Sequence, residues 1–134
     1  MVERATGVTP TRALAVTAAR AAADKKGVAT VVLDVGPLLA ITDAFVITSG
    51  TNDRQVRTIA EEVEAKVKQA GLGVPLRIEG LDDARWVLLD YGDVVVHVFL
   101  EEARHYYDLE RLWSYANRID WEDQPPLRRA GAEA

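Results

Sequence analysis

The chain has 134 residues, of which 49% are hydrophobic and 28% are charged, a balance typical of a protein that folds as one globular domain. Lys and Arg total 16 against 21 Asp and Glu, so the formal net charge is −5, which argues against binding nucleic acid through its phosphates. No apolar run is long enough to span a membrane, no signal-peptide pattern opens the chain, and there is no cysteine for disulfides, zinc or thiol catalysis. The composition therefore predicts an acidic, cytoplasmic, single-domain protein.

Both ends of the chain lack the pattern of a packed segment. Residues 1–10 have no apolar period, and residues 121–134 combine a Pro-Pro pair with Gly and small side chains. Such compositions bury too little surface to hold one conformation. We expect a flexible N-terminal tail over residues 1–10, a folded domain over residues 11–120, and a disordered C-terminal tail over residues 121–134.

The first ordered segment is an Ala-rich stretch over residues 11–26, whose narrow apolar stripe predicts a helix that ends at Gly27. β-branched residues dominate residues 29–35, which predicts a strand closed by the Gly-Pro pair at 36–37. A second strand is predicted over residues 44–48.

The next helix has the clearest start in the sequence. Asn52 is suited to cap it, and Gln55 stands three residues later, where a capping box places a side chain that reaches back to the cap. Apolar residues then recur at helical spacing over residues 56–67, before glycines and Pro75 end the helix. A short strand is predicted over residues 76–79.

Two further strands, over residues 85–90 and 93–100, predict a hairpin around a two-residue turn at Tyr91 and Gly92. Residues 101–117 then predict a single last helix. The element order indicates an α/β sandwich of two or three layers with a mixed five-stranded sheet, and a hairpin excludes a purely parallel sheet.

The predicted hairpin has two different faces. Pairing Asp90 with Asp93 places Leu88 opposite Val95, and successive side chains on a strand point to opposite faces. One face is wholly aliphatic and is assigned to the core. The other face consists of Trp86, Leu88, Val95, His97 and Phe99, with Asp90 and Asp93 at its tip.

This second face has two interpretations. An apolar area that contains a Trp commonly marks a protein-binding site, which favours a docking surface around Trp86. Alternatively, another part of the chain covers the face, and Trp86 and His97 are ordinary core residues. The accessibility of the Trp86 ring distinguishes the two interpretations.

A search for catalytic groups finds one weak signal. The Ser-Gly pair at 49–50 before a capped helix resembles the phosphate-holding turn of nucleotidyltransferase folds. Their chemistry also needs two or three converging carboxylates to hold metal ions, whereas the strands offer Asp34, Glu79 and Asp90 singly. We therefore interpret the pair as part of a helix cap and predict no catalytic residue.

A metal site has equally little support. The two histidines, His97 and His105, are eight positions apart, and without cysteine they would need help from Glu101 and Glu102. Nothing in this spacing favours a common geometry, so we predict no metal and no cofactor.

Three segments of the chain carry distinctive motifs. The first is ITDAFVI, SG and DRQV over residues 41–56, the second is RIEG and WVLLDYGDVVVHVF over residues 77–99, and the third is RHYYDLERLW over residues 104–113. Together they resemble the ribosomal silencing factor family, also called RsfS or Iojap. Ala44 departs from the pattern, since an aromatic residue is expected there, and the two tails match no motif.

The resemblance implies a nucleotidyltransferase-like fold without the catalytic carboxylates. It also implies binding to the large ribosomal subunit through large-subunit ribosomal protein fourteen. A factor bound there would sterically block joining of the small subunit and repress translation under nutrient limitation or in stationary phase. Members of the family are also similar in forming homodimers when free. Neither a direct nucleic-acid site nor a membrane contact is expected.

The predicted contact residues lie in the second and third motifs. Trp86 and Leu88 are expected to anchor the contact, and only one of the adjacent Tyr106 and Tyr107 is expected to face the partner. Two alternative functions remain, a homodimeric adaptor for a non-ribosomal protein and a residual nucleotidyltransferase. The complete predicted set is Trp86, Leu88, Val95, His97, Phe99 and Tyr106, with Asp90 and Asp93 orienting the partner through its basic groups.

Overall fold

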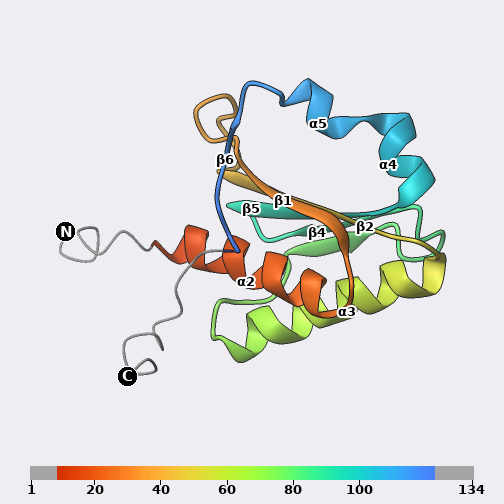
Figure 1. Ribbon diagram of the computed structural model, residues 1–134. Helices are drawn as coiled ribbons and strands as arrows, with labels where there is room; N and C mark the ends of the chain where they lie inside the picture. Colours follow the sequence, from red (N-terminus) through yellow and green to blue (C-terminus); the bar gives the residue numbers. More distant parts are fainter. Residues whose placement is uncertain (1–8, 123–134) are drawn as a thin grey trace.

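The structure, a computed structural model, describes residues 9–122, so most of both predicted tails lies outside the described residues. It has three layers, with α2 and α3 on one face of a six-stranded sheet and α4 and α5 on the other (Figure 1). The strand order is β3-β4-β5-β2-β1-β6. The elements are α2 (Pro10–Asp24), β1 (Val28–Asp34), β2 (Ala44–Gly50), α3 (Asp53–Gln69), β3 (Arg77–Glu79), β4 (Trp86–Asp90), β5 (Val94–Leu100), α4 (Glu101–Tyr107), α5 (Leu109–Leu112) and β6 (Asn117–Arg118).

The first helix begins slightly earlier than predicted. The Thr9 side chain accepts a hydrogen bond of 3.0 Å from the Arg12 N–H, and Pro10 occupies the first turn, where its missing N–H has no cost. Thr9 and Pro10 therefore belong to the folded domain, not to the predicted N-terminal tail.

Asn52 caps α3 as predicted, because its Oδ1 accepts a hydrogen bond of 2.8 Å from the Gln55 N–H. The predicted capping box is wrong about the group that the Gln55 side chain binds. The Gln55 Oε1 accepts from the Thr51 N–H at 2.7 Å, and its Nε2 donates to the carbonyls of Lys25 and Lys26 at 3.1 Å each. Gln55 thereby ties the start of α3 to the end of α2.

The hairpin forms, but its register differs from the predicted pairing of Asp90 with Asp93. The turn residues are Gly92 and Asp93, closed by a backbone hydrogen bond of 2.9 Å from the Tyr91 N–H to the Val94 carbonyl. Gly92 has a φ of 91°, which suits the first turn position of a type II′ hairpin. The shift of two positions keeps every side chain on its predicted face. The observed pairs include Trp86 with Phe99, Leu88 with His97 and Asp90 with Val95.

The predicted last helix is wrong after Tyr107. Asp108 adopts a left-handed conformation with a φ of 51°, which Asp tolerates better than most residues, and the chain turns there into the short α5. Trp113 then packs edge-on against Phe45, with 5.5 Å between ring centroids. The following residues return to the sheet as β6, antiparallel to β1, which makes six strands rather than the predicted five.

Trp121 belongs to the folded domain and not to the predicted C-terminal tail. Its Nε1–H donates a hydrogen bond of 3.0 Å to the Thr30 carbonyl, and its ring packs against the core beneath α2 and α3. Residues 123–134 lie outside the described range.

The aliphatic hairpin face lies in the core between the sheet and the helices α2 and α3, as predicted. It packs under α2 and α3 with Leu14, Ile59 and Val63 among its neighbours. The likeness to nucleotidyltransferase folds stays a prediction. The buried side chains of that hairpin face are Val87, Leu89, Val94, Val96 and Val98.

Candidate docking surface

The second hairpin face is only partly covered by the chain. Phe99 is completely buried and His97 retains 4% of its exposure, because α4 and α5 pack over them. Trp86, Leu88 and Val95 remain half-buried at the border of this cover. Of the predicted contact residues, Phe99 thus lies beneath the surface, and His97, although nearly buried, lines the groove beside Leu88.

Trp86 is fixed on three sides. Its Nε1–H donates a hydrogen bond of 3.0 Å to Nδ1 of His97. Its ring packs against Phe99 and Tyr107, with centroid distances of 4.9 and 4.8 Å. The rest of the indole opens onto a small cleft of about 310 Å³ that it shares with Leu88, Glu79 and Gly80. This arrangement presents a rigid aromatic edge, as a protein-binding anchor requires.

Gly80 permits the close approach of the chain to Trp86. Its φ is 89°, and a Cβ added there would collide with the Trp86 carbonyl oxygen. Only glycine has both the conformational freedom and the space for this position.

A second apolar groove of about 400 Å³ lies beside Leu88. Ile41 and Leu76 line it and keep 83% and 74% of their exposure. Sequence reasoning missed both residues, since Leu76 counts as strand and Ile41 as loop. Their signal is an aliphatic residue beside a turn, outside any periodic pattern. The groove is lined by Leu39, Ile41, Thr42, Phe45, Leu76, Arg77, Leu88, Asp90, Gly92, Val95 and His97.

The two predicted acidic residues at the hairpin tip differ in their surroundings. Asp90 accepts a hydrogen bond of 2.8 Å from the Gly92 N–H and pairs with Arg77, whose Nε lies 3.2 Å from its carboxylate. Asp93 is exposed in the turn itself. Arg77 and Asp90 thus give the groove both signs of charge, and the exposed Asp93 in the adjacent turn is the more accessible carboxylate for a basic partner group.

His97 is neutral in this environment. Burial lowers its pKa from 6.5 to about 4, because the charged imidazolium would lose its hydration. Its Nδ1 accepts the Trp86 hydrogen bond, so the proton resides on Nε2, which has no partner among the described residues.

Tyr106 and Tyr107 both contribute to the aromatic surface. Tyr107 lies against Trp86, and Tyr106 contacts Tyr107 edge-on at 5.1 Å between centroids, farther from the sheet. Tyr106 is exposed, as a contact residue must be. The rings form a continuous row from buried Phe99 to exposed Tyr106.

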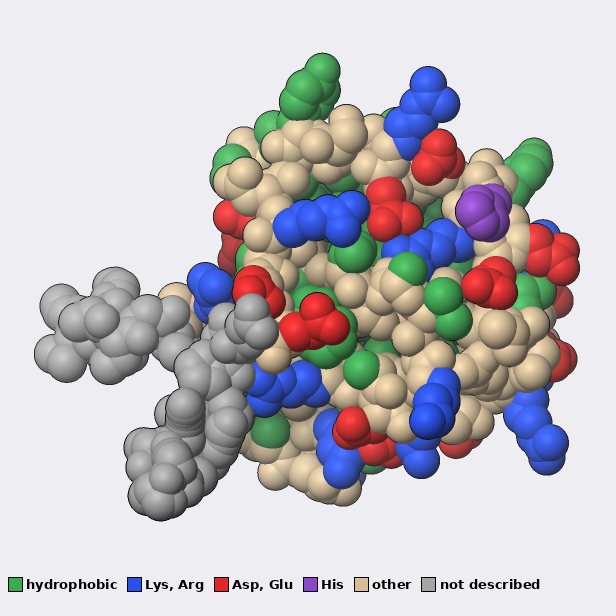
Figure 2. Space-filling view, in the orientation of Figure 1, with side chains coloured by type: hydrophobic (Ala, Val, Ile, Leu, Met, Phe, Trp, Pro, Cys, Tyr) green, Lys and Arg blue, Asp and Glu red, His purple; other side chains and the backbone are tan. Residues whose placement is uncertain are grey.

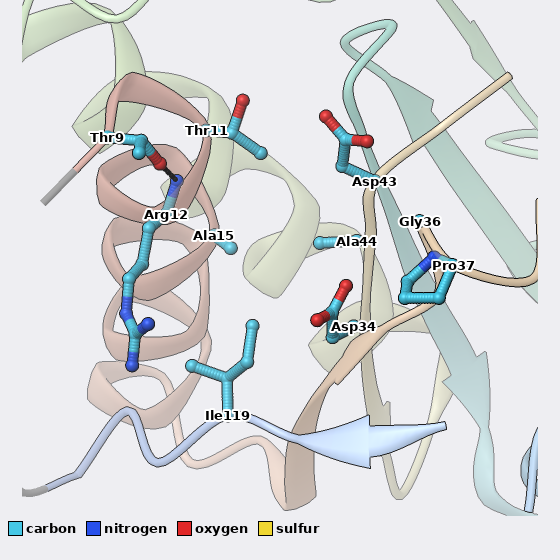
Figure 3. Close-up of a pocket in the computed structure, with 10 residues that line it drawn as sticks. All are labelled: Thr9, Thr11, Arg12, Ala15, Asp34, Gly36, Pro37, Asp43, Ala44 and Ile119. Atoms are coloured by element: carbon cyan, nitrogen blue, oxygen red, sulfur yellow. Dashed lines mark hydrogen bonds between the residues drawn. The ribbon is translucent and has the colours of Figure 1, made fainter. Parts of the chain in front are cut away.

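A larger cleft of about 610 Å³ lies beside α2, where β1 ends and β2 begins. Figure 3 shows Asp34 and Asp43 on its strand side, whereas the Arg12 side chain extends along the helix. Within the described part of the chain, no three His, Asp or Glu side chains form a set that could hold a metal ion.

The Ser-Gly pair at 49–50 has internal roles. The Ser49 hydroxyl donates to the Val28 carbonyl at 3.3 Å and accepts from Arg104 at 3.0 Å. Asn52 provides the helix cap, which agrees with the simpler interpretation of this segment.

The charged side chains are well mixed on the side of the molecule drawn in Figure 2, where acidic and basic groups alternate with small hydrophobic areas. Among residues 9–122, no helix is both long and apolar enough to cross a bilayer.

Comparison with known proteins identifies the class to which this fold and surface belong. The model of a family described as "Ribosomal silencing factor during starvation" matches residues 8–134. The ribosomal silencing factor RsfS of Bacillus subtilis (strain 168) is 44% identical over 103 residues, which cover 77% of this chain and 86% of that protein. A mouse protein named "Mitochondrial assembly of ribosomal large subunit protein 1" is 35% identical over 85 residues, covering 62% of this chain and 37% of its own length.

The fold has solved counterparts. A crystal structure of a Chromobacterium violaceum protein superposes with a TM-score of 0.74 at 38% identity, covering 77% of this chain and 85% of that one. A Bacillus halodurans structure superposes with a TM-score of 0.67 at 39% identity, covering 78% and 93%. The chain belongs to the ribosomal silencing factor family.

Proposed function

We propose that this protein binds the large ribosomal subunit through large-subunit ribosomal protein fourteen, sterically blocks joining of the small subunit and represses translation when nutrients are limited. Family membership supports the ribosomal role, and the name of the mouse relative refers to the large subunit. The observation that carries the docking site is the half-exposed Trp86, which His97 holds beside Leu88, a residue that lines the apolar groove.

The proposed contact has a hydrophobic centre and a charged rim. Trp86, Leu88 and Val95 form the centre, with Ile41 and Leu76 across the groove. Asp90 and Asp93 orient a basic partner surface, and Tyr106 extends the contact along α4. An aromatic anchor within an apolar area that polar groups surround is the arrangement in which most protein–protein binding energy concentrates.

The net charge of −5 favours a protein over RNA as the docking partner. Phosphates repel an acidic surface, so a factor that approaches a ribosome must bind where protein is exposed. The protein acts without catalysis in this proposal, in the cytoplasm, and needs no cofactor.

The test is co-sedimentation of the chain with purified large subunits. Trp86→Ala is expected to weaken binding at least tenfold, since truncation of a central Trp costs about 2 kcal/mol or more. Tyr115→Ala is the matched control, because Tyr115 is 91% exposed and lies outside the proposed surface. Unchanged binding of Trp86→Ala contradicts the proposed site.

The free protein is proposed to be a homodimer that covers the same apolar groove. Exposed Ile41 and Leu76 are costly in water unless a second surface covers them. Analytical ultracentrifugation over a range of concentrations tests this, and added ribosomal protein fourteen should dissociate the dimer. A dimer that persists in the heterocomplex shows that the two surfaces differ.

A further inference from the structure

Of the three contacts that hold Trp86, one is a hydrogen bond with a defined direction. Trp86 Nε1–H is a donor only, and His97 Nδ1, 3.0 Å away, must therefore be the acceptor. An imidazole that accepts at Nδ1 carries its proton at Nε2. The contact consequently requires the neutral form of His97 in one of its two tautomers.

Packing alone does not explain a histidine at this position. His97 is almost fully buried, with the edge of Phe45 at 4.7 Å and Phe99 stacked at 6.2 Å between ring centroids. Its Nε2 has no hydrogen-bond partner among the described residues. A buried donor without a partner lowers stability, so an apolar side chain would suit this core better. The property that only the histidine adds is the acceptor at Nδ1.

We infer that His97 is a positioning residue for docking, which holds the Trp86 indole in the one orientation that the partner surface meets. This inference rests on the proposed function. Without the Nδ1 acceptor, the indole N–H would turn toward water and the ring would adopt several orientations. Docking would then have to order the ring, at the expense of affinity.

Two substitutions of nearly equal shape separate the acceptor from the packing. His97→Asn keeps an acceptor oxygen near the position of Nδ1, whereas His97→Leu has the same branching at Cγ and no acceptor. Both side chains lack the Cε1 and Nε2 atoms of the imidazole ring. In co-sedimentation with large subunits, H97L is expected to bind about tenfold more weakly than the unaltered chain. H97N is expected to stay within about threefold, which is rescue by the variant that retains the hydrogen bond.

The Trp86 Nε1–H resonance in NMR spectra gives a readout that a merely structural role would not move. It is expected to be protected from hydrogen exchange in the unaltered chain and in H97N, and to exchange rapidly in H97L. Rapid exchange in the unaltered chain overturns the inference without any variant. Equal docking by H97L and the unaltered chain also overturns it, as does an equal loss in H97L and H97N.

A double-substitution cycle tests whether His97 acts through Trp86. Trp86→Phe removes the donor, so adding H97L to W86F is expected to weaken docking no further. A further tenfold loss in the double variant overturns the inference. Failure of the underlying function is distinguishable, because W86A then binds like the unaltered chain, whereas failure of this inference leaves W86A weak and H97L normal.

Discussion

The guanidinium of Arg104 and the carboxylate of Glu110 form a bidentate ion pair. Nε lies 3.0 Å from Oε1, and Nη2 lies 3.0 Å from Oε2. The pair bridges the left-handed break at Asp108 and so joins α4 to α5. Arg104 also donates to the carbonyls of Val28 and Ala29, at 3.0 and 2.8 Å. The Arg104 side chain thereby ties α4 and α5, which cover Phe99, to β1 of the sheet.

Replacement of Arg104 by Ala is expected to lower the free energy of unfolding by about 2–3 kcal/mol, because it leaves partly buried acceptors and the Glu110 carboxylate without their donor. The Arg104 side chain is only 11% exposed. Urea denaturation measures the loss. Arg111→Ala is the matched control, since Arg111 is 84% exposed and pairs with Asp108 at 4.0 Å. A similar loss in both variants would contradict a special role for Arg104.

Stability is expected to fall with acidification in a way that His97 controls. The unfolded chain binds a proton at His97 near pH 6.5, whereas the folded chain binds it only near pH 4. The neutral histidine therefore contributes its full stability above pH 6.5, and this contribution is lost as pH falls to about 4. The expected loss is about 3 kcal/mol, from 1.36 kcal/mol per pKa unit.

Urea denaturation of the unaltered chain and of His97→Leu at several pH values between 7 and 4 isolates this contribution. Acidic groups titrate in both proteins, so the difference between the two curves reports His97 alone. Parallel curves over this range would mean that His97 is not buried in the neutral form.

Gly80→Ala is expected to destabilise the protein by about 2–3 kcal/mol, since the new Cβ meets the Trp86 carbonyl at a φ of 89°. Gly71→Ala is the matched control. Its φ is 74° with nothing near the added Cβ, so it carries only the conformational cost of about 1 kcal/mol. Thermal unfolding of both variants measures the difference, and equal losses would show that β3 moves aside freely.

The groove residues that sequence reasoning missed are expected to matter for docking and not for folding. Leu76→Ser removes an exposed apolar side chain from the proposed contact and should weaken co-sedimentation about fivefold, with stability changed by less than about 0.5 kcal/mol. Leu112→Ser is the control, because Leu112 is 73% exposed on α5 and does not line the groove. Equal binding by both variants would exclude Leu76 from the contact.

The sequence predicts the hairpin better than its surroundings, for a physical reason. Alternation places Val96 and His97 on opposite faces of β5, and a register shift of two positions leaves each on the same face as before relative to β4. The break at Asp108 has no such safeguard. Helical periodicity continues across it, and the left-handed conformation is stabilised by contacts that are distant in sequence, those of Arg104 and of Trp113 on Phe45.

The burial of Phe99 follows from that break and was equally out of reach of sequence patterns. A straight helix over residues 101–117 would leave the second face uncovered, whereas the bent chain returns across it to form β6. Ile41 and Leu76 show the converse problem. Their exposure arises from the arrangement of two loops that only the folded sheet brings to one groove.

The two outermost strands of the sheet are very short, with three residues in β3 and two in β6. Unpaired backbone amides and carbonyls along such margins offer little length for another chain to extend the ladder. Because its edge strands are short, a protein with an exposed apolar surface is expected to bind partners through side chains and not by extending its sheet. Short edges also disfavour fibrous aggregation. A variant with a longer β3 would therefore be expected to associate through its sheet edge, without any gain in the side-chain contacts of the docking surface.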